Sequence, residues 1–281
     1  MNEVQNFVFE GLGIRGSLVR LEETWREVIA EHDYPANVRR LLGKSVAATV
    51  LMTTGLKGSP KVSLQLQGDG PLKLLLIQCS GELEVRGMAQ WREASPETAL
   101  LGEGRLAVNL DAGVPGRIFQ GIVPLISNEI DACLEAYFRQ SEQIPTRLVL
   151  RATEERVAGL ILQALPQNDP TDETFATAVA MAASVSAKEL SELPAKRLLP
   201  RLFDGFAIRL FSPRPVTHDC RCTPTHLAGV VRMLGAQELD ELLAERGEVE
   251  LTCEFCNRVF QYDEAAIQAI LSDPAPGHVL H

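Results

Sequence analysis

Four of the six cysteines lie near the C-terminal end of the chain in two close pairs. Cys220 and Cys222 are separated by one residue, Cys253 and Cys256 by two, and thirty residues lie between the pairs. Two close pairs joined by a long spacer can present four sulfur ligands to one tetrahedral ion, and Zn²⁺ favours such thiolate ligands. The sequence therefore predicts one Zn²⁺ per chain, bound by these four cysteines.

The segments around the cysteines predict a small zinc-ribbon-like region. Residues 249–252 and 258–262 alternate between apolar and polar like two short strands, with the second cysteine pair in the turn between them. The spacer predicts two short helices, the first capped by Thr223 and the second ended by Gly247, and Asp263 is placed to cap a last helix over 264–271. We therefore expect short elements arranged around the metal.

This region has few apolar residues for its length, and small segments of this kind usually need a metal to fold. A structural zinc contributes roughly 10–16 kcal/mol of apparent binding free energy, against about 5–15 kcal/mol for the stability of a whole domain. Because thiolates react with oxidants, oxidation would remove most of what holds the region folded. A permanent structural zinc is the commoner role of four-cysteine sites, but the weak core and the one-residue spacing of the first pair favour a redox-sensitive site.

No other residues form a recognisable reaction centre. Cys79 and Cys133 fall in apolar patterns that predict buried, unreactive thiols. His218 precedes the first cysteine pair, but four cysteines already fill a tetrahedral site. The residues at 11–16 have scattered glycines that predict a loop and fit no phosphate-binding motif. We therefore expect no catalytic residues and a protein that is not an enzyme.

Composition limits the possible partners and compartment. The chain has 281 residues, of which 46% are hydrophobic and 23% charged, as in soluble globular proteins. A net charge of −10 argues against a nucleic-acid partner. The first residues lack the features of a signal peptide, and no apolar run is long enough to cross a membrane. We expect a cytoplasmic protein, in a compartment where clustered cysteines are more often metal ligands or redox centres than structural disulfides.

The pattern of elements predicts an α+β protein in three parts. Residues 1–170 form a mixed α/β core domain, residues 171–217 a helical linker region, and residues 218–281 the zinc-binding domain. Within the core domain we expect helices over 22–29, 35–55 and 128–139 and strands over 18–21, 62–67, 72–79, 83–86, 106–110, 118–125, 147–151 and 157–165. The strand at 72–79 is apolar enough to be buried on both faces, and 167–170 reads as the boundary of the domain. The Ala-rich segment 174–191 predicts a helix that buries little area and docks weakly for its length.

Motifs along nearly the whole chain resemble one family. The C-terminal part combines the two cysteine pairs with residues 239–243 (LDELL) and 247–249 (GEV). The upstream landmarks, in family order, are Arg15-Gly16, Tyr34-Pro35, 67–71 (QGDGP), 137–146 (YFRQSEQIPT) and 162–166 (LQALP). Together they resemble the redox-regulated holdase chaperones of the 33-kDa heat shock protein family.

The resemblance implies a function and a switch. It implies an ATP-independent chaperone that is inactive when the four cysteines hold zinc. Oxidation would convert them to two disulfides, Cys220 with Cys222 and Cys253 with Cys256, releasing zinc and unfolding the C-terminal domain and linker. The oxidised protein would form a homodimer and bind unfolded or partly folded client proteins, without nucleic acid or membrane. The stretch 223–226 departs from the more basic family pattern, which would alter the threshold of the switch.

Two other functions fit the cysteines. A thiol-disulfide oxidoreductase could use Cys253 and Cys256, although the strand-helix setting of thioredoxin-type motifs is lacking. A zinc-ribbon module could bind nucleic acid or protein, although the acidic charge argues against nucleic acid. Turnover of a disulfide substrate would distinguish the first alternative, and a salt-dependent shift with DNA or RNA the second.

Overall fold

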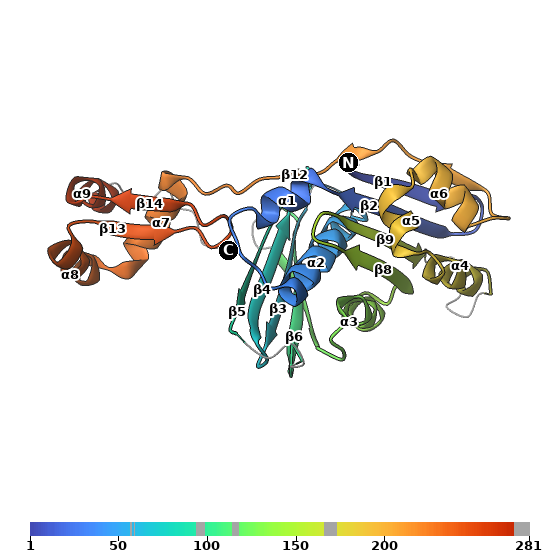
Figure 1. The fold of residues 1–281 in the computed structure, drawn as a ribbon, viewed down its shortest axis with the longest axis horizontal. Helices are drawn as coiled ribbons and strands as arrows, with labels where there is room; N and C mark the ends of the chain where they lie inside the picture. The colour runs from blue at the N-terminus through green and yellow to red at the C-terminus, as the bar shows by residue number, and fades with distance from the viewer. Residues whose placement is uncertain (57, 59, 94–98, 114–117, 166–172, 273–281) are drawn as a thin grey trace. The chain divides into compact units, whose positions relative to one another are not determined.

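The computed structural model describes residues 1–281 except 57, 59, 94–98, 114–117, 166–172 and 273–281. The chain forms two compact units, Met1–Asp219 and Cys220–His281 (Figure 1). The expected fold class, a mixed α/β region with a smaller cysteine-bearing region, is confirmed. The division of the first unit into core and linker stays a prediction, because its expected boundary at 167–170 lies outside the described residues.

The first sheet of the larger unit brings the N-terminus beside distant segments. Its strands are β1 (Asn2–Phe9), β2 (Ile14–Leu21), β8 (Thr146–Ala152), β9 (Val157–Ala164), β10 (Ile208–Leu210) and β11 (Arg214–Pro215). The order is β10-β1-β2-β9-β8, with β11 also pairing with β1, and all neighbours are antiparallel. Gly16 in β2 lies under the Phe7 ring, where a Cβ atom would be 2.3 Å from the ring.

The second sheet is formed mostly by the chain between β2 and β8, and most of its neighbouring strands are consecutive in sequence. Its strands are β3 (Lys61–Gly68), β4 (Leu72–Cys79), β5 (Glu84–Trp91), β6 (Gly104–Asp111), β7 (Ile118–Pro124) and β12 (Thr217–His218). The order is β12-β5-β4-β3-β6-β7, and β12 pairs with β5 in parallel. The strand β12 therefore ties the segment just before Cys220 to this sheet.

Helix α2 (Ala36–Thr54) packs against strands of both sheets (Figure 1). It is buried over most of its surface, as expected of a helix enclosed by a core. Shorter helical segments flank the sheets, namely α1 (Glu23–Ile29), α3 (Ile130–Tyr137) and a π-helical turn η1 (Phe138–Glu142). The predicted helix at 128–139 is thus shorter and ends in a π-helical turn.

Three helices cover the other face of the first sheet. They are α4 (Glu173–Ala183), α5 (Ala187–Glu192) and α6 (Ala195–Leu202). Their buried side chains form a second apolar core with the sheet, which includes Phe7, Phe9 and Leu160 from the strands and Phe175, Leu198 and Phe203 from the helical segment. Ser186 and Glu189 form a reciprocal capping box that starts α5. The Ala-rich segment is therefore two helices where the sequence predicted one.

The smaller unit contains α7 (Pro224–Leu234), α8 (Ala236–Arg246), β13 (Val249–Thr252), β14 (Val259–Tyr262) and α9 (Glu264–Ser272). Strands β13 and β14 form an antiparallel hairpin. The amide of Ala266 donates to Asp263 Oδ1 over 2.8 Å, and Gly247 ends α8 in a left-handed conformation. The predicted strands and helices, the Asp263 cap and the Gly247 stop are confirmed, whereas the Thr223 cap stays a prediction.

Two expectations for the larger unit are wrong. Residues 14–16 begin β2 and are not loop, because Ile14 pairs with Phe9 and completes the β1–β2 hairpin. Strand β4 is buried on one face only, since Lys73 is exposed and Leu74 and Leu76 are half-buried. Strand β1 was not predicted from the sequence.

Candidate metal centre

The hairpin of β13 and β14 positions the second cysteine pair. The Cys253 amide donates to the Arg258 carbonyl over 2.9 Å, and the Asn257 amide donates back to the Cys253 carbonyl over 2.8 Å. Asn257 has a φ of 50°, in the left-handed region that asparagine tolerates better than most residues. The turn is thus closed by backbone bonds, with Cys253 buried and Cys256 half-buried.

The first pair lies just before α7. The Cys222 amide donates to the Cys220 carbonyl over 2.5 Å, which bends the backbone within three residues. Cys222 is buried and Cys220 half-buried. Two side-chain contacts help to hold the small unit together: Tyr262 donates to the Pro224 carbonyl over 3.1 Å, and Arg232 Nε donates to the Ile270 carbonyl over 3.0 Å.

The four sulfur atoms converge. All lie within 4.8 Å of one another, with 3.6 Å between the sulfurs of Cys220 and Cys253 and 3.3 Å between those of Cys222 and Cys256. A tetrahedral ion about 2.3 Å from each sulfur would place the sulfurs about 3.8 Å apart. The sulfur positions therefore fit one ion with the four predicted ligands.

The electrostatics of the cluster also fit a cation. Burial, followed by the neighbouring thiols, raises the pKa of Cys220 above its usual value and raises that of Cys222 to about 11. Burial also disfavours the Cys253 thiolate, but hydrogen bonds from the Phe255 and Cys256 amides and from neighbouring thiols leave its pKa lowered. Several thiolates would repel one another here, so a cation is the group that would allow four to coexist.

The two amides that favour the Cys253 thiolate were missed by sequence reasoning. They belong to the backbone, and no residue type signals them. The nearest signal is Asn257, directly after the second pair, whose type is compatible with the tight turn.

The small unit has little apolar core of its own. Within its described residues, 220–272, five apolar side chains outside the cysteines form the buried cluster: Val231, Leu239, Val249, Tyr262 and Ile267. A core of this size gives limited stability without another cross-link. The dependence on a metal expected from the sequence is thus consistent with the packing.

The remaining candidate residues lie in the larger unit. Cys79 is buried in β4, and burial raises the pKa of its thiol to about 12. Cys133 is buried in α3, where its sulfur donates to the Ser127 carbonyl over 3.3 Å. His218 lies in β12, where it pairs with Val85 in the parallel ladder. The two buried cysteines agree with the expectation of unreactive thiols.

A family model described as "Hsp33 protein" matches residues 2–263 of the chain. The chain belongs to the Hsp33 family. The "33 kDa chaperonin" of Shewanella sediminis is 37% identical, over 97% of this chain and 96% of its own length. The "33 kDa chaperonin" of Pectobacterium atrosepticum is 35% identical, over 100% and 99%. The sequence-based resemblance is therefore confirmed, and the protein is an Hsp33-family chaperone.

The fold agrees with this membership. The crystal structure of a 33 kDa chaperonin, a heat shock protein 33 homologue from Thermotoga maritima, superposes with a TM-score of 0.82. The match covers 96% of this chain and 98% of that one at 22% identity, so it shows the shared fold. Among the described residues, no helix is both long and apolar enough to span a membrane.

Proposed function

We propose that this chain is a redox-regulated, ATP-independent holdase whose off state is held by zinc on Cys220, Cys222, Cys253 and Cys256. The observation that carries the proposal is the convergence of four sulfurs in a unit with a small apolar core. With the metal bound, the C-terminal unit is folded and the chaperone inactive. Loss of the thiolates removes the ligands and, with them, most of the stability of that unit.

The segment before Cys220 supports a coupling between the cysteines and the linker helices. Between α6 and Cys220 the chain is held by three short strands, β10 of three residues and β11 and β12 of two each. Side chains add three bonds: Thr24 donates to the Val216 carbonyl over 2.8 Å, Gln5 to the Phe211 carbonyl over 2.8 Å and Arg214 to the Gly81 carbonyl over 2.7 Å. Strands this short have few ladder bonds and open at lower cost than the long strands of the sheets, and unfolding of the C-terminal unit would spread through this segment toward α4–α6.

The surface that such unfolding would expose is apolar. Helices α4–α6 cover a sheet face that includes Phe7, Phe9, Leu18 and Leu160. Part of what the helices place on it is alanine, as at 178, 182 and 195, and alanine buries little area. An uncovered face of large apolar side chains is a surface that unfolding client proteins would bind.

The oxidation proposed is the formation of two disulfides, Cys220 with Cys222 and Cys253 with Cys256. In forming each disulfide, a pair of thiols loses two electrons and two protons to an oxidant such as a peroxide, which is reduced to an alcohol or water. In the folded unit, sulfurs of different pairs are in contact, Cys220 with Cys253 over 3.6 Å and Cys222 with Cys256 over 3.3 Å. Pairing within each motif therefore requires local rearrangement, which loss of the ion would permit.

The test follows zinc, thiols and activity on one sample of the full chain. Treatment with peroxide and heat should release one zinc per chain, consume four thiols and suppress aggregation of a thermally unfolding client without ATP. Mass-spectrometric mapping should find each disulfide within one motif. Cys253→Ser should bind zinc poorly, whereas a Cys79→Ala, Cys133→Ala control should behave like the parent chain.

A fully oxidised, zinc-free protein that fails to suppress aggregation would overturn the proposal. Catalytic turnover of a small disulfide by the reduced chain would favour the oxidoreductase instead. The proposal also places the protein in the cytoplasm, where thiols stay reduced without stress, and makes its oxidised form a homodimer, which light scattering before and after oxidation would test.

A further inference from the structure

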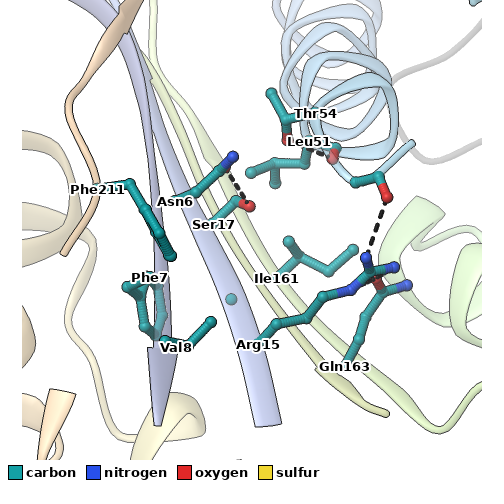
Figure 2. A pocket seen from close by; sticks show the side chains of 12 residues that line it. Asn6, Phe7, Val8, Arg15, Ser17, Leu51, Thr54, Ile161, Gln163 and Phe211 are labelled. Atoms are coloured by element: carbon teal, nitrogen blue, oxygen red, sulfur yellow. Dashed lines mark hydrogen bonds between the residues drawn. The ribbon is translucent and has the colours of Figure 1, made fainter. Parts of the chain in front are cut away.

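A cavity of about 230 Å³ lies in the larger unit, where β1, β2 and β9 pass the C-terminal end of α2 (Figure 2). It is remote in sequence from the cysteines and takes no part in the proposed switch. Drug-sized ligands occupy about 300–1,000 Å³, so this cavity suits a smaller molecule. The polar lining comes from Asn6, Arg15, Ser17, Thr54 and Gln163.

The guanidinium of Arg15 is the cation of this cavity. Arg15 Nη1 donates to the Gly55 carbonyl over 3.0 Å, while Nε and Nη2 donate to Gln163 Oε1 over 3.1 and 2.9 Å. These three bonds use three of the five N–H donors of a guanidinium. Two N–H donors of Arg15 are left, and the acceptors of its three bonds, the Gly55 carbonyl and the Gln163 amide oxygen, are neutral.

Arg15 has no acidic partner among the described residues, since none of the ion pairs found there includes it. Arg20, on the same strand, provides the contrast: it is buried, whereas Arg15 is half-buried, and it pairs with Glu3 over 2.9 Å. Burial lowers the pKa of both residues, and for Arg20 the carboxylate of Glu3 works against that shift. The charge of Arg15 is thus partly desolvated, and no carboxylate forms an ion pair with it among the described residues.

The end of α2 offers part of the missing charge. Gly55 is the C-cap residue of that helix, and its carbonyl accepts the bond from Arg15. A helix C-terminus carries roughly half a negative charge. This contact explains the orientation of Arg15. It leaves the two remaining donors and the open volume beside them unexplained.

The rest of the cavity is apolar. Figure 2 shows Phe7, Val8 and Phe211 on one side of the view. Leu51, from α2, and Ile161, from β9, lie nearer its centre. The Asn6 side-chain oxygen accepts a bond from Ser17 over 2.7 Å, so these two polar groups satisfy each other in part. The lining therefore combines one cation with an apolar wall.

Motifs singled out in the sequence meet around this cation. Arg15-Gly16 lies in β2 and Gln163 in β9, and the 137–146 motif supplies Tyr137, Phe138 and Glu142 to a second cavity of about 50 Å³ that Arg15, Gly55 and Gln163 also line. The zinc switch makes no use of these residues. Residues from three of these motifs therefore lie around one guanidinium.

We propose that the 230 Å³ cavity binds a small aliphatic carboxylate. Its oxygens accept from the two remaining N–H groups of Arg15, as guanidinium favours carboxylate, and its alkyl chain contacts Val8, Leu51 and Ile161. A free short-chain acid and the C-terminus of a peptide with an apolar last residue share this chemistry.

The test uses the full, reduced, zinc-loaded chain and hexanoate as the probe. Methyl NMR should show hexanoate shifting the signals of Leu51 and Ile161 in a saturable way, and hexanamide should bind at least tenfold more weakly. N-acetyl-Gly-Leu and its C-terminal amide test a peptide C-terminus in the same way. Tighter binding of hexanoate would identify a free short-chain acid as the ligand, and tighter binding of N-acetyl-Gly-Leu would identify a peptide C-terminus.

Variants then assign the contact. Arg15→Gln should weaken hexanoate binding at least tenfold. Arg105→Gln is the matched control, because Arg105 makes the same two-nitrogen contact with a glutamine, Gln67, on an exposed surface outside the cavity. It should leave binding unchanged.

A second variant guards against loss of folding in Arg15→Gln. Gly55 has helical backbone angles, and a Cβ there would be 3.6 Å from Arg15 Nη2 and 3.7 Å from Gln163 Oε1, ordinary contact distances. Gly55→Leu should therefore fold and obstruct the cavity. Equal binding of hexanoate and hexanamide, unchanged binding in Gly55→Leu, or no methyl shifts at saturating probe would each overturn the proposal. The assay needs neither oxidant nor client, so its failure is distinct from failure of the chaperone proposal.

Discussion

Replacing Phe203 with alanine should loosen helices α4–α6 from the first sheet. Phe203 follows α6 directly and is 0% exposed. Its ring centre lies 5.0 Å from that of Phe9 and 6.0 Å from that of Phe7. The residue thus joins the helical segment to the sheet by direct aromatic packing.

The size of the effect follows from this burial. Truncating a buried phenylalanine to alanine costs about 3–5 kcal/mol. If the contacts of Phe203 are broken when the helices open, the opening equilibrium rises roughly 10²–10⁴-fold, at about 1.4 kcal/mol for each factor of ten. Amide exchange across 173–202 should accelerate by that factor while exchange in β3–β6 stays slow.

Hydrogen exchange followed by mass spectrometry measures this directly on the reduced, zinc-loaded chain. Phe119→Ala is the matched control, since Phe119 in β7 is 61% exposed and its truncation should change little. Under the proposed function, Phe203→Ala should also suppress client aggregation in part without oxidant. Unchanged protection of 173–202 would refute the packing argument, and faster exchange without any chaperone activity would refute the role given to the covered sheet face.

Three further outcomes are expected. Arg201, followed by the Ser186 cap, lowers the pKa of Glu189 from 4.5 to about 2. The ionised Glu189 therefore stabilises the start of α5 fully above pH 4.5, and this stabilisation is lost as the pH falls toward 2. Amide protection of α5 should decrease over this pH range in the parent chain, and this pH dependence should be absent in Glu189→Gln. Burial raises the Cys79 pKa to about 12, so iodoacetamide should leave Cys79 unmodified in the native chain at pH 8 and react after denaturation; rapid native labelling would contradict its burial. Asp263→Ala removes the cap on the Ala266 amide and should cost α9 about 1 kcal/mol, read from faster exchange in 264–272, with Asp263→Asn retaining most of the protection.

The metal centre was predictable because its information is local. Ligand type and spacing specify the four cysteines, and the alternation at 249–252 and 258–262 specifies the hairpin that carries one pair. The Asp263 cap and the Gly247 stop are likewise properties of a few neighbouring residues. The sequence therefore determined which four cysteines converge, the small fold around them and the family.

Long-range pairing was decided by the tertiary structure. Strand β1 lies between β2, its neighbour in sequence, and β10, about two hundred positions further along the chain. No local pattern encodes the pairing of β1 with β10. The strand β4 has an apolar sequence, but its exposure depends on what packs against each face. The division of the Ala-rich segment into two helices depends on the turn before the Ser186 cap and on docking against the sheet.

The same distinction separates the two sites. The sequence alone named the four cysteines whose sulfurs converge, since each pair is close in sequence and its residue type is rare and specific. It could not place Arg15 beside Gly55 and Gln163, because these residues come from three distant segments and each is common by itself. Only the folded sheet and helix α2 bring them together, and only the fold leaves the guanidinium half-buried among neutral hydrogen-bond acceptors.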